Sequence, residues 1–287
     1  MISHLNNLLF FTPIWVIGIA LFGGMLGAAW IGSRLRARHN RARHKDADAK
    51  EAGDKEGLIV SSVMGLLALL VGFTFSLALD RFDARRAGVL EEANAIGTIY
   101  LQTQLLDAPD RARISQLLTD YANNRLTLSQ ATPGARTNAA LATNDRLITQ
   151  LWTATVATFP SIKGYDFSST YVESMNHTID MDAARRAARR ANIPGELLLL
   201  LFIYQLVAAG VVGYVLTGER GRQSSAFLFL LFGFSLLVVI DLDRPITGWI
   251  RVSQQPIVDL IDFIRANPPA TFGSPLAADP GRKPDNL

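Results

Sequence analysis

Apolar residues gather in four runs along the chain, and none of these runs contains a charged side chain. The runs cover residues 8–31, 58–79, 197–216 and 223–240. At about 1.5 Å of rise per helical residue, each is long enough to cross the roughly 30 Å hydrocarbon core of a bilayer, the last one narrowly. The pattern therefore predicts four transmembrane helices.

The segment between the second and third runs, residues 80–194, is polar and carries apolar residues at helical spacing. Ile114, Leu118 and Tyr121, for example, fall on one face of a helix. Proline and glycine breaks divide the segment into four predicted helices, near 80–106, 110–130, 136–158 and 167–192. No alternating pattern typical of strands competes with them.

These elements predict an all-α membrane protein with four transmembrane helices and a water-soluble helical bundle inserted between the second and third. No Gly-Pro break interrupts residues 70–97, so the second span and the first soluble helix are expected to be one continuous helix. The expected order is transmembrane helix 1 (1–33), a basic cytoplasmic loop (34–57), transmembrane helix 2 (58–79), the soluble domain (80–194), transmembrane helix 3 (195–217), transmembrane helix 4 (223–241), a post-membrane segment (242–266) and a disordered, proline-rich tail (267–287).

The distribution of basic residues predicts the orientation. Residues 34–57 carry eight Lys or Arg side chains, whereas the chain before Pro13 carries none. The positive-inside rule therefore places residues 34–57 in the cytoplasm. Because successive spans alternate in direction, residues 80–194 are then expected in the periplasm, with the spans in a bacterial inner membrane. The first run is interpreted as a retained span rather than a signal peptide, because its leader lacks basic residues. Anionic lipid and topology explain the sequence pI of 9.3 more simply than a nucleic-acid partner does.

The second span carries a stripe of mostly small or polar residues at heptad-like spacing. The stripe consists of Ser62, Gly65, Leu69, Gly72, Ser76 and Asp83. Small residues let helices pack closely in lipid, so one interpretation is a packing surface. The other is that Gly72, Phe73, Ser76 and Asp80 face a pore, with Phe73 or Phe75 forming an apolar constriction. Two further small-residue pairs, Gly23 with Gly27 and Ala209 with Gly213, are expected to be packing surfaces.

Two acidic residues, Asp241 and Asp243, stand at the carboxyl end of the fourth span, where they oppose the helix dipole and need partners or a role. Alternation places this end beside the end of the second span and the start of the third. The sequence therefore predicts a charged belt that joins them to basic and acidic residues of the soluble helices. The other members of this belt are Arg81, Arg85, Glu91, Glu92, Arg185 and Arg186. The belt is either a structural girdle of ion pairs or a place where ions bind or gating occurs.

Four motifs carry a resemblance to a known family: LVGFTFSLALDRFDARR, EEANAIG, LLTDYANNRL and the DLDRP that follows the fourth span. Together they resemble the bestrophin-like bacterial membrane proteins of unassigned function, and more remotely the bestrophins. Bestrophins imply a homopentameric anion channel whose second helix lines an aromatic-ringed neck, which places Gly72, Phe73 and Phe75 in that neck. Phe82 and Asp83 stand where bestrophins have paired tryptophans, and the large helical domain of bestrophins is cytosolic.

The sequence offers little support for catalysis. The chain has no cysteine and four scattered histidines, and it lacks a phosphate-binding loop, a nucleophile elbow and a metalloprotease motif. Glu173 and His177 stand four residues apart, but a solvated helix face explains them better than a metal site. We therefore expect no enzyme, cofactor or metal. The partners expected are the lipid bilayer, further copies of the chain and inorganic ions. Two functions stay open: an oligomeric ion channel, or a non-conducting sensor or scaffold with an extracytoplasmic helical domain.

Overall fold

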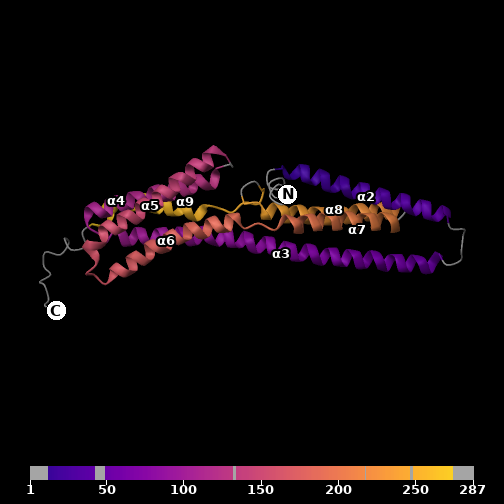
Figure 1. Cartoon of the computed structure of the whole chain (residues 1–287), viewed down its shortest axis with the longest axis horizontal. Coiled ribbons are helices and arrows are strands. Elements are labelled where there is room, and N and C mark those ends of the chain that lie inside the picture. Colours follow the sequence, from indigo (N-terminus) through magenta and orange to yellow (C-terminus); the bar gives the residue numbers. More distant parts are fainter. Residues whose placement is uncertain (1–11, 43–48, 132–133, 217, 246–247, 274–287) are drawn as a thin grey trace. The chain divides into compact units, whose positions relative to one another are not determined.

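The computed structural model describes residues 12–42, 49–131, 134–216, 218–245 and 248–273. All regular structure in these ranges is helical (Figure 1). The α-helices are α2 (Ile14–Ala42), α3 (Ala49–Thr103), α4 (Ala108–Gln130), α5 (Ala135–Ile162), α6 (Phe167–Arg190), α7 (Gly195–Val215), α8 (Gly218–Asp243) and α9 (Gln255–Ala266), and a short 3-10 helix, η1, covers Pro269–Phe272.

Within the described ranges, four helical segments are long and apolar enough to cross a membrane. They correspond to α2, α3, α7 and α8, which contain the four apolar runs of the sequence. Residues 1–11 lie outside the described residues, so the part of the first predicted span before α2 is not covered. The all-helical prediction and the number of candidate spans are confirmed for the described part of the chain.

Two helices extend into the segment that the sequence assigns to a basic loop. Helix α2 continues to Ala42 and α3 begins at Ala49, so only residues 43–48, which lie outside the described ranges, separate them. Alanine, arginine, lysine and glutamate dominate this segment and have high helix propensity, and no proline interrupts it. Helix α3 also continues without a break from its apolar part to Thr103, as the sequence predicts.

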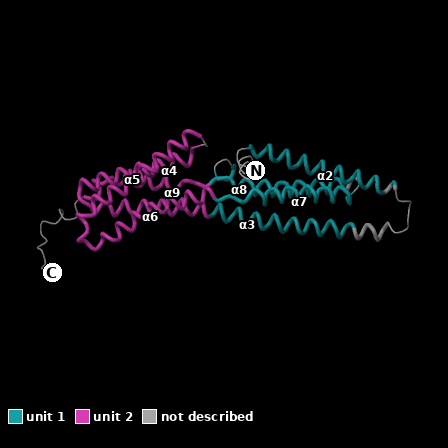
Figure 2. Tube along the Cα trace, viewed as in Figure 1, with its two compact units in different colours: residues 1–83, 191–251 teal, residues 84–190, 252–287 magenta. Residues whose placement is uncertain are grey.

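The chain divides into two compact units, which Figure 2 colours separately. Unit 1 comprises residues 1–83 and 191–251, and unit 2 comprises residues 84–190 and 252–287. The core of unit 1 forms where α2, α7, α8 and the apolar part of α3 pack together, and it includes Leu21, Leu67, Val71 and Val212. These helices bury one face each and leave many apolar side chains exposed, as lipid-facing helices do.

Helices α2 and α7 approach each other closely at glycines. A Cβ atom on Gly32 would lie 2.1 Å from the carbonyl oxygen of Gly210, and one on Gly213 would lie 2.2 Å from that of Ala29. Gly213 therefore belongs to a packing surface, as expected. Within the described part of the chain, nothing lies within 4 Å of a Cβ on Gly23 or Gly27, so their packing stays a prediction. Three- or four-residue spacing identifies a helix face but not which of several small-residue faces is covered.

Unit 2 is built around the charged part of α3, with α4, α5, α6 and α9 packed on it. Its core includes the buried rings of Tyr100, Tyr121 and Tyr171. Helix α9 contributes four buried aliphatic side chains, Ile257, Leu260, Ile261 and Ile264. Unit 2 is thus completed by a helix from the predicted post-membrane segment, in addition to the helices between the second and third spans.

Two further boundaries differ from the predictions. Helix α5 does not end before Pro160 but continues to Ile162, so Pro160 lies in its last turn, where its missing N–H costs the helix one backbone hydrogen bond. The predicted disordered tail begins with η1, whose Phe272 packs on the unit 2 core. The Tyr100 hydroxyl also donates to the carbonyl of Asn267 at 2.7 Å, which holds the start of the tail. The rest of the predicted tail, 274–287, lies outside the described residues.

Candidate functional site

The pore candidates of the sequence lie on the part of α3 that belongs to unit 1. Gly72, Ser76 and Asp80 are exposed, and nothing lies within 4 Å of a Cβ on Gly72. Phe73 is 67% exposed and Phe75 is 40% exposed. All five residues therefore point away from the core of their own unit.

The exposed stripe lies opposite the face by which α3 packs into unit 1. The packed face is formed by Leu67, Val71 and Ala78, which are buried. At about 100° of rotation per residue, Gly72, Ser76 and Asp80 fall within about 80° of one another on the far side of the helix. The hydroxyl and carboxylate of this stripe are exposed in the described part of unit 1, which makes it the face of α3 that lipid would cover least favourably.

The two phenylalanines lie on different sides of the stripe. They are two positions apart in the sequence, so they point about 200° apart around the helix axis. Both therefore cannot line one narrow pore. Phe73 follows Gly72 directly and is the more exposed of the two, which makes it the better candidate for a constriction.

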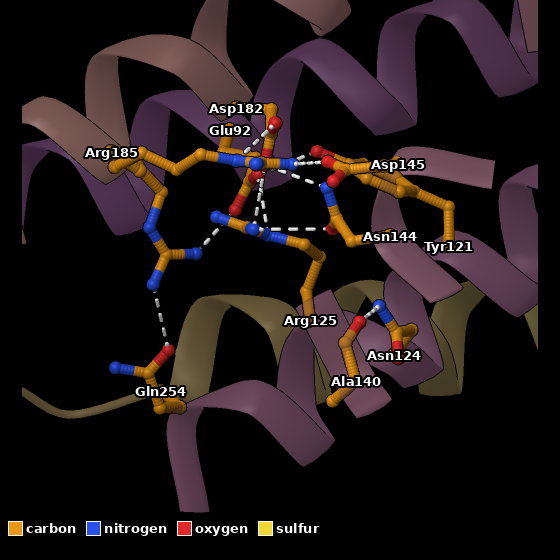
Figure 3. Close-up of polar contacts among 11 residues, drawn as sticks. Glu92, Tyr121, Asn124, Arg125, Ala140, Asn144, Asp145, Asp182, Arg185 and Gln254 are labelled. Carbon is orange, nitrogen blue, oxygen red and sulfur yellow. Dashed lines mark hydrogen bonds and ion pairs between the residues drawn. The ribbon is translucent and has the colours of Figure 1, made fainter. Parts of the chain in front are cut away.

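The interior of unit 2 contains a buried cluster of charged and polar side chains, shown in Figure 3. At its centre is Glu92 of α3, which has no exposed surface. Its carboxylate accepts a hydrogen bond from the Tyr121 hydroxyl at 2.8 Å and lies 2.8 Å from Nε of Arg125, and it also pairs with Arg185. A single carboxylate from the predicted belt thus connects α3 to α4 and α6.

A second carboxylate, that of Asp182 on α6, completes the cluster. Its Oδ1 accepts hydrogen bonds from Arg125 at 2.8 Å and from the Asn144 amide at 3.1 Å. Its Oδ2 lies 2.8 Å from Nε of Arg186. Arg125 therefore bridges both buried carboxylates, and α5 joins the cluster through Asn144.

At its edge the cluster is more exposed. Arg186 also pairs with Asp145, whose side chain is exposed, and Arg185 donates to the side-chain oxygen of Gln254 at 3.2 Å (Figure 3). In total three carboxylates face three guanidinium groups. The charges of these six side chains balance and the groups are hydrogen-bonded, which is the condition under which buried charges are tolerated. Arg189 lies close enough that burial, followed by the charges of Arg125 and Arg185, lowers its pKa.

Burial and neighbouring charges shift the pKa values of Tyr121, Arg125 and Arg186 in the cluster. Burial, followed by the nearby Glu92 carboxylate, raises the pKa of Tyr121 well above its usual value, so its hydroxyl keeps the proton that it donates. Burial lowers the pKa of the Arg125 guanidinium, but Glu92 and Asp182 outweigh burial, so the net shift of its pKa is upward. Tyr121 and Arg125 therefore both keep their protons at neutral pH.

Asp241 and Asp243 have main-chain partners in unit 1. The Asp241 carboxylate accepts hydrogen bonds from the amides of Trp249 at 3.0 Å and Ile250 at 2.9 Å. The Asp243 carboxylate accepts from the amide of Ile193, with both oxygens at 3.0 Å. Each carboxylate thus holds a non-helical segment against the end of α8. Their predicted membership of a belt with the arginines stays a prediction.

The remaining belt candidates differ in exposure. Arg81 is half-buried in unit 1, and Arg85 is buried in unit 2. Glu91 is exposed and lines a groove of about 660 Å³ between α3 and α6, together with Glu173 and His177. Among the residues with described positions, no three His, Asp or Glu side chains converge as metal ligands would.

Of the residues in the cluster, Glu92, Arg185 and Arg186 were predicted site residues, whereas Arg125, Asn144 and Asp182 were not. A signal for Arg125 was present, because it continues the buried face of α4 that contains Ile114, Leu118 and Tyr121. A charged residue at a position where helical spacing requires an apolar one indicates a buried ion pair.

Comparison with known proteins identifies the family and the fold. The family model for the Bestrophin-like domain matches residues 19–257. The fold resembles crystal structures of a bacterial Bestrophin homolog from Klebsiella pneumoniae. A tryptophan-to-alanine variant of that protein has a TM-score of 0.66 and 13% identity, covering 92% of this chain and 99% of the other. A tyrosine-to-alanine variant has a TM-score of 0.63 and 15% identity, covering 89% and 99%. No curated protein sequence matches the chain.

Proposed function

The chain belongs to the Bestrophin-like family, and we propose that copies of it assemble into an ion channel in the bacterial inner membrane with α3 lining the pore. The observation that carries this proposal is the exposed stripe of Gly72, Ser76 and Asp80, which lies opposite the face by which α3 packs into its own unit. Such a stripe is stable in a membrane when other copies of the chain or water cover it.

The side chains of the stripe have the properties of a pore lining. Gly72 leaves space beside the helix axis, and Ser76 offers a hydroxyl that replaces part of an ion's hydration. Phe73 beside them supplies an apolar constriction, which gates by excluding water when it is narrow. Asp80 places a negative charge at one end of this stretch and attracts cations there unless a neighbouring arginine neutralises it.

Ion flux into liposomes tests the proposal. Purified protein reconstituted at defined density is expected to pass ions, and Ser76→Trp is expected to lower the flux at least tenfold because the indole fills the pore. Phe73→Ala is expected to raise it by widening the constriction. Leu230→Trp is the matched control, because Leu230 is an exposed apolar residue of α8 and faces lipid in this proposal. The permeant ion is identified by exchanging the cation and the anion in turn.

A non-conducting sensor or scaffold is the second candidate. The observation that favours it is the groove of unit 2 lined by Glu91, Glu173 and His177, which offers a polar surface to a partner. This function predicts protein that carries no flux at any potential or pH and that purifies as a monomer or dimer. A higher oligomer that conducts, with flux sensitive to Ser76→Trp and insensitive to Leu230→Trp, would contradict it.

A further inference from the structure

Unit 1 contains an apolar cleft at the end where α2 and α7 terminate. Its volume is about 500 Å³, and three helices form its walls. Its lining includes Ile31 and Leu35 of α2, Glu56 of α3, and Val207 and Val211 of α7. The volume is within the range of small-molecule sites and the walls are hydrocarbon, so the cleft is suited to an apolar chain.

Two glycines lie at the base of the cleft. Gly32 and Gly210 line it at the point where the backbones of α2 and α7 come together, and a Cβ on Gly32 would lie 2.1 Å from the carbonyl oxygen of Gly210. The base of the cleft is thus formed by main chain. The cleft is therefore a consequence of the close approach of the two helices and is preformed in the single chain.

The charged residue that lines the cleft is neutralised. Glu56 forms an ion pair with Arg36, with 2.6 Å between the guanidinium nitrogen and the carboxylate oxygen. The same nitrogen donates to the carbonyls of Tyr214 at 2.9 Å and Val215 at 3.2 Å, which are the last two residues of α7. Arg36 is thus occupied by protein partners and does not supply charge to a ligand.

Two other arginines, Arg34 and Arg38, follow the cleft-lining Ile31 on α2, and neither has such partners among the described residues. Arg34 lies over the exposed ring of Trp30, with its guanidinium carbon 4.6 Å from the ring centroid. Arg38 follows Ile31 by seven residues, so it lies two turns further along the face of α2 that lines the cleft. Neither arginine forms an ion pair with any residue whose position is described. Tryptophan and arginine at the end of an apolar helix mark the level of lipid headgroups.

We propose that this cleft binds an anionic phospholipid, with one acyl chain between α2 and α7 and the phosphate at Arg34 and Arg38. The apolar walls select a hydrocarbon chain, which a free phosphate lacks. The guanidinium groups of Arg34 and Arg38, which form no ion pair with the described residues, select a net negative headgroup over a zwitterionic one, because charge-assisted hydrogen bonds to phosphate are strong. Lipid binding at this site does not depend on whether the protein conducts ions. The lipid site and the proposed channel can therefore be tested separately.

Native mass spectrometry of delipidated full-length protein in detergent tests the site. Phosphatidylglycerol and phosphatidylcholine with the same acyl chains are titrated in parallel. We expect phosphatidylglycerol to bind more tightly, by about fivefold for each arginine that contacts it. Arg34→Gln with Arg38→Gln is expected to abolish this preference, while Arg251→Gln, an exposed arginine of unit 1 outside the cleft, leaves it unchanged.

A second variant tests the acyl-chain part of the site independently. Val207→Trp places an indole in the cleft and is expected to weaken the binding of both lipids by at least fivefold. Leu230→Trp, on the exposed face of α8, is expected to leave the binding of both lipids unchanged. Inorganic phosphate is expected not to displace phosphatidylglycerol. Equal binding of the two lipids by the wild-type protein, an unaltered preference in the double arginine variant, displacement by phosphate, or full binding by Val207→Trp would each overturn the proposal.

Discussion

Glu92 has no exposed surface, and its carboxylate contacts Tyr121, Arg125 and Arg185. A buried carboxylate with fewer partners than this would favour its neutral form or destabilise the fold. Asp182 is held in the same way by Arg125 and Asn144. Removing one member leaves an uncompensated charge in the interior of unit 2, so these residues have large and coupled effects on stability.

Arg125→Met is expected to lower the free energy of unfolding by about 3–5 kcal/mol, because two carboxylates lose a buried partner. Glu92→Gln is expected to cost a similar amount, and the double variant less than the sum of the two. Chemical unfolding followed by the fluorescence of unit 2 measures these changes. The control is Arg113→Met on the same helix, whose ion pair with Asp110 is partly exposed and contributes about 0–1 kcal/mol. Additive effects of Arg125 and Glu92 would show that they do not act as one cluster.

Tyr121→Phe is expected to lower stability by about 1–3 kcal/mol at neutral pH through the lost hydrogen bond to Glu92. It should also change the alkaline pH dependence. Because the pKa of Tyr121 is raised in the folded chain, its contribution is complete below the unfolded value of about 10 and is lost as the pH rises toward the folded pKa. The wild-type protein should therefore lose stability more steeply above pH 10 than the variant. If stability falls equally with pH in the wild-type protein and the variant above pH 10, the raised pKa of Tyr121 does not contribute to stability.

At this scale the sequence predicted which helices carry charge but not which charges meet. Glu92 and Arg185 are separated by 93 positions, and nothing in local spacing pairs them. Asp241 and Asp243 accept hydrogen bonds from the main-chain amides of Ile193, Trp249 and Ile250, which were not among the partners predicted for them. Main-chain donors cannot be predicted from residue types, because every residue except proline has a main-chain N–H group.

Among the elements, α3 presents its small and polar residues opposite its buried ones, and this arrangement makes a prediction about neighbouring copies. If α3 lines a central axis, Ser76 of one copy lies near Ser76 of the next. The chain has no native cysteine, so single-cysteine variants report one position at a time. Ser76→Cys in membranes is expected to form covalent dimers on mild oxidation, since a disulfide requires Cβ atoms about 3.5–4.5 Å apart.

Ile19→Cys is the control for this experiment, because Ile19 is an exposed apolar residue of α2 that faces lipid in the proposed assembly. It should remain monomeric under the same oxidation. Equal cross-linking of the two variants would indicate random collision in the membrane, and cross-linking of Ile19→Cys alone would place α2 rather than α3 between copies.

Helix boundaries could be predicted where a strong breaker coincides with a change of polarity. Helices α4 and α6 begin next to Pro109 and after Gly164, close to the expected positions. Pro160 does not mark the end of α5, because the helix continues for two more residues despite the one backbone hydrogen bond that proline cannot donate. The packing of Gly32 rather than Gly23 against α7 depends on how α2 is rotated. Rotation is set by tertiary contacts, which one span's sequence does not contain.

At the scale of the whole molecule, residues distant in sequence complete each unit. Unit 2 takes α9 from beyond the fourth span, and the buried aliphatic side chains of α9 close its core. The sequence predicted the bundle between the second and third spans. It did not predict that α9, a short amphipathic helix, packs on the core of unit 2. Truncating the chain before Gln255 is therefore expected to expose that core and to increase proteolysis of α4, which limited digestion of membranes measures. Undiminished resistance would show that α9 is dispensable.

The orientation of the chain is the remaining prediction at this scale, and two residues of the described structure test it. The positive-inside rule places the basic end of α2 in the cytoplasm, so a residue after the second span must lie on the other side of the membrane. Ala37→Cys and Gln130→Cys introduce single thiols at exposed positions on α2 and α4. In intact cells whose outer membrane has been permeabilised, an impermeant maleimide is expected to label Gln130→Cys at once and Ala37→Cys only after lysis. The reverse pattern would place the helical domain in the cytosol, as in bestrophins. In that case residues 34–57 would be periplasmic. Their eight basic side chains would then lie on the periplasmic side of the membrane, contrary to the positive-inside rule.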